Sequence, residues 1–456
     1  MPKKKTALTI EERLQQALVP AEEQPYEVPE NWVWVRLGAV NKYISKSVNP
    51  ISEPDKIFEL YSVPSMVDNY PEIIAGSDIG SSKQSVCKKD VLLCKINPRI
   101  NRVWKVSQFT DNELIASSEW IIIRNNHIDE NYLMYCFQSK YFREFMLSNV
   151  SGVGGSLMRA QPKYVQTYPV PLPPLSEQQR IVERIEELFA KLDEAKERLQ
   201  EVADSFAVRK AAILHKAFTG ELTKQWRREN GMSDESWEEE TIGDVCTVNP
   251  KKIDAKNLDD NLEVSFVPMA AVSDVFGEIV NHEVKNLQDV RTGFTNFSEG
   301  DVIFAKITPC MENGKSAIVG PLVNDIGYGS TEFYVLRCKK ELYNKYLYHM
   351  VRNTTFRAEA KAVMTGAVGQ QRVPKTFLQE YQLLLPTLSE QHEIVRLIDD
   401  LLARERKAQQ ATEQALASID LMKKSILARA FRGELGTNKA SEASALELLR
   451  QVLVEN

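Results

Sequence analysis

Two segments of the chain carry apolar residues at alternating steps of three and four. The first seam consists of Ile181, Ile185, Leu188, Leu192, Ala195, Leu199, Val202 and Phe206. The second consists of Ile394, Ile398, Leu401, Ala408, Ala415, Ile419, Met422 and Ile426, and it is interrupted by the polar residues Glu405 and Thr412. Heptad spacing of this kind is typical of coiled-coil helices. It predicts two helices of roughly 40 residues, each about 60 Å long at 1.5 Å per residue.

The two segments are copies of one another. When Ser176 is set on Ser389, 47 residues align without a gap and 18 of them are identical. Each copy opens with LSEQ and closes with AFTGEL (217–222) or AFRGEL (430–435). We therefore infer a duplication. The serines, with Gln179 completing a capping box for Ser176, predict the helix starts, and Gly220 and Gly433 predict the ends.

An exposed apolar stripe of this length is unfavourable in water, so each seam needs a partner. The simplest partner is the other seam, and we expect the two helices to pair as an antiparallel coiled coil. The expected pairing residues are Ile181, Ile185, Leu188, Leu192, Leu199, Phe206, Ile394, Ile398, Leu401, Ile419 and Ile426. The alternative is that each helix docks on a separate protein.

A globular region precedes each helix. Both regions mix helical and strand-like patterns, with VWVRL, IFELYSV, DVLLCKI and SEWIIIR in the first, and VSFVPMA, DVIFAKI and TEFYVLR in the second. The fold class we expect is α/β (α+β), with two such domains in a pseudo-two-fold arrangement, each followed by a long helix. The expected order is an extension (1–24), a first domain (25–174), a helix and exit (175–235), a second domain (236–387), a helix (388–436) and a tail (437–456), whose order the sequence leaves open. The two domains correspond only loosely, and diverged loops on a shared scaffold are expected to carry specificity.

Composition narrows the class of protein. Apolar residues make up 43% and charged residues 26% of the chain, which are ordinary globular values. Neither an apolar leader after the basic start nor a membrane-length apolar run is present, so we expect a cytoplasmic protein without membrane contact. The six cysteines show no C-x-x-C spacing and no metal-ligand spacing with the histidines, so no metal site is expected.

One strongly basic stretch lies in the first domain. Between Lys83 and Lys105 there are seven cations and a single acid, Asp90. The candidate DNA-binding residues of this stretch are Lys83, Lys88, Lys89, Lys95, Asn97, Arg99, Asn101, Arg102, Trp104 and Lys105. Arginine, lysine and asparagine hold phosphates or read base edges. A solvated lysine-rich strand edge is an equally simple interpretation. The less basic counterpart in the second domain contributes Lys306, Thr308, Asn313 and Lys315.

Each domain closes with a glycine-rich loop that carries a cation. The loops are SGVGGSLMR and TGAVGQQR, and their candidate DNA-binding residues are Gly154, Gly155, Arg159, Gln370, Gln371 and Arg372. Glycines allow a backbone to approach a phosphate or a groove closely. Such a loop is often only a turn, but its recurrence at the same place in both copies favours a function.

The motifs of cofactor and catalytic chemistry are incomplete or missing. NGKS at 313–316 lacks the earlier glycine of a P-loop, because Pro309 stands there. INPR at 96–99 lacks the second proline and aromatic of an amino-methyltransferase motif. We therefore expect a chain that binds rather than catalyses.

A variable region is followed by PLPPLSEQQRIVERIEELFAKLDEAKERL and AFTGELTKQWR, and a second variable region is followed by LLPTLSEQHEIVRLIDDLL and ILARAFRGEL. This combination resembles the specificity (S) subunit of Type I DNA restriction and modification systems. The resemblance covers nearly the whole chain. It implies that each globular region is a target recognition domain for one half of a bipartite, asymmetric double-stranded DNA site, and that the helices set the gap between the halves.

The resemblance also implies partners. Two methyltransferase (modification) subunits that carry S-adenosylmethionine are expected to dock on the helices, and restriction subunits that use ATP and Mg²⁺ to join them, so that this chain itself binds no cofactor. The net charge of −6 predicts weak DNA binding by the chain alone. The rival interpretations are a coiled-coil scaffold that joins two protein-binding domains without DNA, and an enzyme with its own nuclease or methyltransferase centre.

Overall fold

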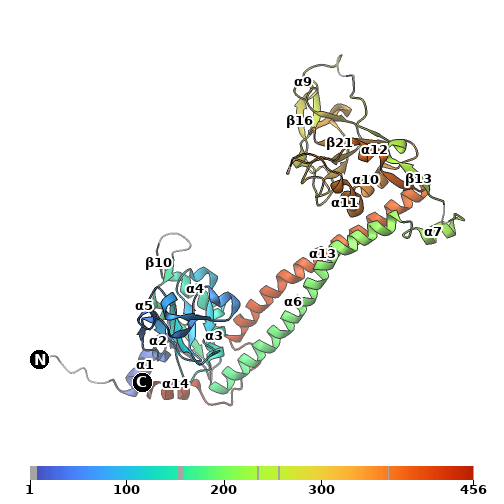
Figure 1. Cartoon of the computed structure of the whole chain (residues 1–456). Helices are drawn as coiled ribbons and strands as arrows, with labels where there is room; N and C mark the ends of the chain where they lie inside the picture. Colours follow the sequence, from blue (N-terminus) through green and yellow to red (C-terminus); the bar gives the residue numbers. More distant parts are fainter. Residues whose placement is uncertain (1–7, 153–157, 234–235, 255–256, 368, 455–456) are drawn as a thin grey trace. The chain divides into compact units, whose positions relative to one another are not determined.

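The computed structural model describes residues 8–152, 158–233, 236–254, 257–367 and 369–454 (Figure 1). The chain divides into two compact units, residues 1–199 with 414–456 and residues 200–413, called unit 1 and unit 2 below. Each unit contains one mixed helix-and-sheet domain and a portion of both long helices. The expected α/β domains, each followed by a long helix, are confirmed.

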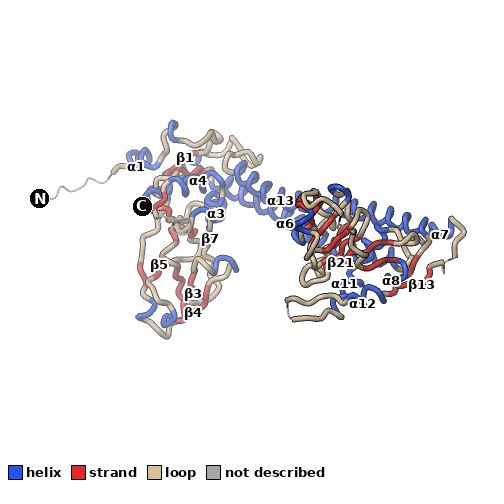
Figure 2. Tube along the Cα trace, turned by 90° about the horizontal axis from the view of Figure 1, so that it is seen from above, coloured by secondary structure: helices blue, strands red, loops and turns tan. Residues whose placement is uncertain are grey.

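Unit 1 is built on two sheets and two strand pairs. Its shorter helices are α1 (Ile10–Ala17), α2 (Leu37–Val40), α3 (Glu130–Gln138), α4 (Lys140–Ser148), α5 (Pro162–Val165) and α14 (Ala445–Val454). Its strands are β1 (Val33–Arg36), β2 (Ser47–Val48), β3 (Ile57–Tyr61), β4 (Glu72–Ala75), β5 (Lys83–Ser85), β6 (Val91–Cys94), β7 (Val103–Lys105), β8 (Glu113–Ala116), β9 (Trp120–Ile123), β10 (Val150–Ser151), β11 (Arg159–Ala160) and β12 (Pro169–Leu172). One sheet has the order β2-β5-β8-β3-β4, and strands β3, β4 and β5 lie together in Figure 2. The other has the order β7-β6-β9, and β1 pairs with β12.

Unit 2 repeats this plan. Its shorter helices are α7 (Lys224–Glu229), α8 (Ile242–Val245), α9 (Leu287–Val290), α10 (Asn344–Arg352), α11 (Thr354–Ala362) and α12 (Lys375–Glu380). Its strands are β13 (Glu238–Thr241), β14 (Cys246–Val248), β15 (Glu263–Val267), β16 (Glu283–Asn286), β17 (Thr295–Phe297), β18 (Val302–Ala305), β19 (Ser316–Ile318), β20 (Gly327–Gly329), β21 (Phe333–Cys338) and β22 (Gln382–Leu385). The sheets have the orders β16-β15-β20-β17 and β14-β21-β18-β19, and β13 pairs with β22.

The two domains share one feature of strand arrangement. A parallel pair, β3 with β8 or β15 with β20, lies inside an otherwise antiparallel sheet in both units. All seven strand-like segments of the sequence form strands. Strand β12 was not predicted, because its sequence PVPL contains two prolines, which lack the amide needed inside a sheet. It pairs only with β1, so one side of its backbone needs no sheet partner.

The long helices are α6 (Leu175–Phe218) and α13 (Leu388–Ala430). They pack against each other in opposite directions within each unit, as Figure 1 shows. In unit 1 Lys423 lies 2.5 Å from Asp193, and in unit 2 Arg209 lies 3.0 Å from Glu405. The predicted antiparallel pairing of two helices of about 40 residues is confirmed.

The seam is buried most deeply where the helices meet the domains. Ile181 and Ile185 lie in the core of unit 1 with Leu427 near the end of α13. In the same way, Ile394 and Ile398 lie in the core of unit 2 with Leu214 near the end of α6. Of the remaining predicted pairing residues, Phe206 and Ile419 are buried, whereas Leu188, Leu192, Leu199, Leu401 and Ile426 are half-buried.

Both polar interruptions of the second seam have partners. Glu405 accepts from Nε of Arg209, and the Thr412 hydroxyl donates to the carbonyl of Ala408 at 2.9 Å. Because these polar groups are satisfied, they interrupt the apolar pattern without leaving an unpaired buried donor or acceptor.

The predicted capping box is wrong. Helix α6 begins at Leu175, so Ser176 lies inside its first turn instead of preceding it. In α13, which begins at Leu388, the residue before the helix takes the capping role: Thr387 Oγ1 accepts from the amide of Glu390. The predicted C-terminal ends of the two helices are confirmed. Each helix ends two or three residues before a glycine with positive φ, Gly220 (76°) for α6 and Gly433 (74°) for α13.

The tail after residue 436, left open by the sequence, contains a helix. Leu449 and Val452 of α14 are fully buried in the unit 1 core, beside Leu14 and Ala17 of α1. Arg180 of α6 forms a bidentate ion pair with Glu442 just before this helix. Helices α1 and α14 are therefore integral to unit 1.

Candidate nucleic-acid interface

The cation of each glycine-rich loop pairs with a glutamate of its own domain. Arg159 donates from Nε and Nη2 to Glu119 at 3.2 Å, and Arg372 donates from the same atoms to Glu332 at 2.9 and 2.8 Å. The hydrogen bonds from Arg372 lower the pKa of Glu332. These arginines hold the end of each loop against the sheet, and their predicted contact with bases stays a prediction.

The same loop ends lie beside the segments that follow β6 and β18. Ile96 pairs with Arg159 and Ile307 pairs with Arg372 in isolated bridges. The Asn97 amide donates to Met158 at 2.8 Å. In unit 2 the Thr308 amide donates to the carbonyl of Gln371 at 3.0 Å. In each domain the structure thus joins two sequence features that were predicted separately, the polar stretch and the glycine-rich loop.

The basic stretch of unit 1 divides into exposed and engaged side chains. Lys88, Lys89 and Arg99 are exposed, whereas Lys83, Lys95, Asn97, Asn101, Arg102 and Lys105 are half-buried. Lys89 lies 3.5 Å from Glu130, and Lys105 donates to Asn131 at 2.6 Å.

The one acid of this stretch and its one tryptophan both face inward. Asp90 is 1% exposed and binds Arg124 through two hydrogen bonds of 2.7 and 2.6 Å. Its charge is therefore neutralised inside the domain. Trp104 is 5% exposed and donates to Asn69 from within the core, so its ring is a packing element in this structure and leaves the candidate surface.

The counterpart in unit 2 is less accessible. The Lys306 amine donates to the carbonyl of Thr331 at 2.7 Å, and burial lowers its pKa. Lys315 donates to the carbonyl of Met269, and Thr308 to that of Gln371. Asn313 and Gln370 are exposed and Gln371 is half-buried. Gly154 and Gly155 of the first loop lie outside the described residues.

Each LSEQ motif joins one long helix to the exit of the other, a role that the sequence did not reveal. Buried Glu177 accepts from the Trp32 indole at 2.9 Å and from Asn438, which follows α13, at 2.7 Å. Buried Glu390 accepts from Thr223 and Arg227, which follow α6, at 2.7 Å each. The sequence did contain a signal for this contact, because the LSEQ motif and the GEL motif occur together in both copies.

The neighbouring glutamines join each helix to its own domain. Gln178 accepts from the amide of Asp129 at the start of α3, at 2.9 Å. Gln391 accepts from the amide of Tyr343 at the start of α10, at 2.7 Å. Each glutamine also donates to a carbonyl just before its own long helix, at Pro173 or Pro386. Two adjacent side chains of the motif therefore orient the domain on the helix pair.

Over the described part of the chain, three or more His, Cys, Asp or Glu side chains do not gather into a group that could hold a metal ion. Among the described helices, none combines the length and the apolar character that crossing a membrane requires.

The model of one protein family matches the chain twice. Its description is Type I restriction modification DNA specificity domain, and it matches residues 29–204 and 234–415. The chain belongs to this family. Each match starts in or just before one of the two domains and ends inside the long helix that follows, so the repeated unit of the family is the repeated unit of this fold.

Several characterised proteins are similar to parts of the chain. The Type I restriction enzyme EcoEI and EcoAI specificity subunits of Escherichia coli are each 32% identical to it, over 260 and 263 residues. These alignments cover 48% of this chain but only 43% and 44% of the two relatives. The MjaVIII specificity subunit of Methanocaldococcus jannaschii is 22% identical over 409 residues, which cover 86% of this chain and 92% of the relative.

Solved structures share the fold. The HsdS subunit from Thermoanaerobacter tengcongensis superposes with a TM-score of 0.65 at 22% identity, covering 91% of this chain and 100% of that one. A chain from a study of complex assembly and conformational transition of the Type I R-M system superposes with a TM-score of 0.68 at 21% identity, covering 90% and 100%.

Proposed function

We propose that this chain is the DNA-sequence specificity subunit of a Type I restriction-modification complex. Each domain reads one half of a bipartite, asymmetric site in double-stranded DNA. The observation that carries the proposal is the double match to the specificity-domain family, because it assigns the same kind of domain to both halves of the chain. Two domains of one fold with different loops supply two different half-site sequences.

The proposed reading surface in each domain is the segment after β6 or β18 together with the adjoining glycine-rich loop. In unit 1 the exposed Arg99 of this segment, together with the exposed Lys88 and Lys89 just before β6, is suited to phosphates. In unit 2 the exposed amides of Asn313 and Gln370 are suited to adenine edges, which bind asparagine and glutamine through two hydrogen bonds. Arg159 and Arg372 act indirectly, by holding the loops through Glu119 and Glu332.

The antiparallel helices set the gap between the half-sites. Helices of about 43 residues are about 60 Å long, a length comparable to one or two turns of DNA. Locks at Glu177 and Glu390 tie the exit of each helix to the start of the other and so restrain sliding of the pair.

The chemistry belongs to partner subunits in this proposal. Two methyltransferase subunits that carry S-adenosylmethionine dock on the helices and their flanks, and restriction subunits that use ATP and Mg²⁺ complete the complex. Because the chain carries a net charge of −6, its affinity for DNA depends on the basic surfaces of those partners.

Genome-wide methylation mapping tests the proposal. In cells that express the chain with its modification subunit, we expect methylated adenine in a single bipartite motif. Replacement of residues 236–387 by those of a relative should change one half of the motif and leave the other half intact. A coiled-coil scaffold without DNA recognition predicts no dependence of the motif on this exchange.

A further inference from the structure

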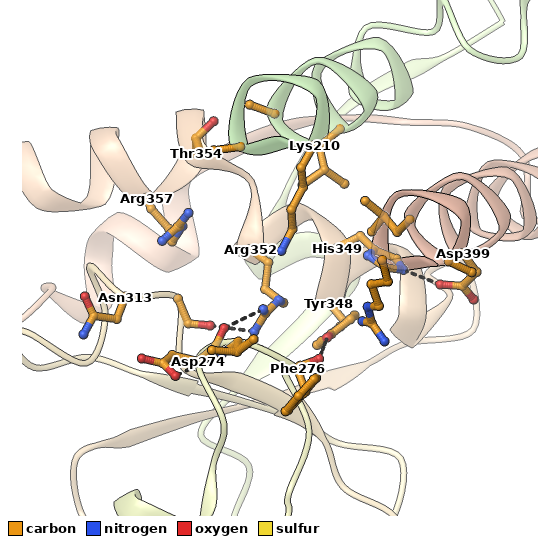
Figure 3. A pocket seen from close by; sticks show the side chains of 18 residues that line it. Lys210, Asp274, Phe276, Asn313, Tyr348, His349, Arg352, Thr354, Arg357 and Asp399 are labelled. Carbon is orange, nitrogen blue, oxygen red and sulfur yellow. Dashed lines mark hydrogen bonds and ion pairs between the residues drawn. The ribbon is translucent and has the colours of Figure 1, made fainter. Parts of the chain in front are cut away.

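Unit 2 contains a cavity of about 440 Å³ between the two long helices and the helices α10 and α11. Four cations line it: Lys210 on α6, Arg352 on α10, Arg357 on α11 and Arg406 on α13. Figure 3 shows Lys210, Arg352 and Arg357 directed toward one space from three different helices. The cavity lies apart from the loop end at Arg372 and reaches the β18–β19 connection only at Asn313 and Gly314.

These cations are not neutralised by carboxylates. Arg352 donates to the carbonyls of Gly314 and Asp274 at 2.8 and 2.9 Å, and Arg357 donates to that of Glu312 at 2.6 Å. Arg357 Nε is buried and has no hydrogen-bond partner among the described residues. Within the same described part of the chain, neither Lys210 nor Arg406 forms an ion pair.

The two acids of the cavity wall are already engaged. Asp399 binds His349 at 3.1 Å and lies 3.5 Å from Lys345. The Asp274 side chain accepts from the amide of Val275 at 3.0 Å. Positive charge therefore remains in excess inside the cavity.

The internal repeat provides a direct comparison. At the offset of 213 residues, Lys210 corresponds to Lys423 and Arg406 corresponds to Asp193. In unit 1 this pair is an ion pair, with the lysine amine 2.5 Å from the carboxylate. In unit 2 the acid has become an arginine, so the same position on the helix pair places two cations near each other.

The electrostatic consequence is a lowered pKa of Lys210. Partial burial lowers its pKa first, and the nearby charges of Arg352, Arg406 and Arg357 lower it further. Burial also lowers the pKa of Arg352 and of Arg357. A bound anion removes this repulsion and provides acceptors for donors on all four side chains.

We propose that this cavity is a binding site for a phosphate group. Guanidinium groups match the tetrahedral oxyanion through paired hydrogen bonds, and a lysine amine adds a point charge. The cavity exceeds the volume of phosphate alone, and the rings of Phe276 and Tyr348 form part of its wall, so a larger phosphorylated molecule also fits. The inference does not rest on the proposed DNA recognition.

The test compares two charge reversals on α13. Arg406→Asp recreates the ion pair of unit 1, whereas Lys407→Asp makes the same change of charge at an adjacent exposed position that does not line the cavity. Isothermal titration of the full chain with sodium phosphate, against sodium chloride at equal ionic strength, should show binding by the wild type and by Lys407→Asp. We expect Arg406→Asp to weaken it by at least about tenfold, because a charge-assisted hydrogen bond is lost.

A second arm separates the sources of the phosphate group. If a DNA backbone phosphate occupies the cavity, inorganic phosphate binds weakly, but Arg406→Asp lowers the affinity of the full chain for a non-target duplex more than Lys407→Asp does. Arg406→Gln replaces Arg406→Asp if the latter fails to fold. Equal behaviour of the two α13 variants toward both phosphate and DNA overturns the proposal, as does the absence of binding to either.

Discussion

Arg227 donates from Nη1 to Oε1 of Glu390 at 2.7 Å, and the two side chains are 5% and 0% exposed. The glutamate belongs to the LSEQ motif at the start of α13, and the arginine follows the GEL phrase after α6. In unit 1 the equivalent Glu177 accepts from neutral groups, the Trp32 indole and the Asn438 amide. The repeated phrases are thus the two sides of a buried lock, which is charged in unit 2.

Removal of the glutamate from this lock should be costly. Glu390→Ala leaves the buried Arg227 guanidinium without its carboxylate, and breaking a buried pair costs about 3–5 kcal/mol. We expect faster native-state amide exchange at residues 223–232, by an amount that corresponds to this free energy. Glu393→Ala, on the same helix, removes a pair with Arg396, whose side chain is 62% exposed, and should cost less than about 1 kcal/mol. Equal exchange in the two variants contradicts a structural role for the lock.

Two glycines at the exit of α13 separate backbone strain from steric clash. Gly433 and Gly436 both have φ of 74°, but a Cβ at Gly433 lies 2.4 Å from Cγ of Pro29, whereas one at Gly436 meets nothing within 4 Å. Gly436→Ala should destabilise unit 1 by about 1–2 kcal/mol, the usual penalty for an L residue with left-handed backbone.

Gly433→Ala should cost more than Gly436→Ala, because Pro29 or the helix exit must also shift. Urea denaturation followed by the fluorescence of the adjacent Trp32 measures both variants. The prediction concerns which of the two variants loses more free energy of unfolding. If Gly433→Ala is the milder change, the close approach of the exit to Pro29 is wrong.

The Glu332–Arg372 pair gives a pH-dependent contribution to stability. Hydrogen bonds from Arg372 hold the pKa of Glu332 below its ordinary value of 4.5. The stabilisation is therefore complete above pH 4.5 and is lost as the pH falls through the lowered pKa. Because the Arg372 side chain is 43% exposed, solvent screening keeps this contribution small.

Glu332→Gln should destabilise unit 2 at pH 7 and have no effect at a pH well below the carboxylate's lowered pKa. Urea titrations of the wild type and the variant at pH 7 and at a series of lower pH values measure the difference. Glu299→Gln, at an exposed position, is the matched control and should be neutral throughout the series. A loss that persists unchanged to the acid end of the series means that packing, and not charge, holds the loop.

Periodicity in the sequence was sufficient to predict the two long helices and the duplication. A seam of steps of three and four identifies a long helix because packing of this kind repeats along its whole length. The same logic found the strands with continuous apolar runs, such as VLLC and WIII, which are buried on both faces. It failed at PVPL, whose strand is formed by its pairing with β1 and not by local preference.

The candidate site was harder to predict, because side-chain partners depend on tertiary structure. A cation in a glycine-rich loop is typical of phosphate binding, but Arg159 and Arg372 face glutamates 40 residues away in sequence. A tryptophan among lysines is typical of a nucleic-acid surface, but Trp104 is in the core. The sequence did not predict the cation cluster of unit 2, because its four members are scattered from residue 210 to residue 406.

The cations that follow β6 in unit 1 allow the reading surface itself to be tested. Simultaneous substitution of Lys95, Arg99 and Arg102 by alanine removes three positive charges from the segment after β6. If this surface contacts DNA, methylation of the target site by the assembled methyltransferase falls, and the slope of log affinity against log salt becomes shallower by up to about three. Substitution of Lys191, Lys196 and Arg198 on the exposed part of α6 removes the same charge outside the reading surface, so methylation falls in this variant only if the methyltransferase subunits are lost from the complex. Retention of the methyltransferase subunits by both variants, measured by co-purification, separates a loss of DNA contact from a loss of assembly. A scaffold without DNA recognition predicts full methylation in both.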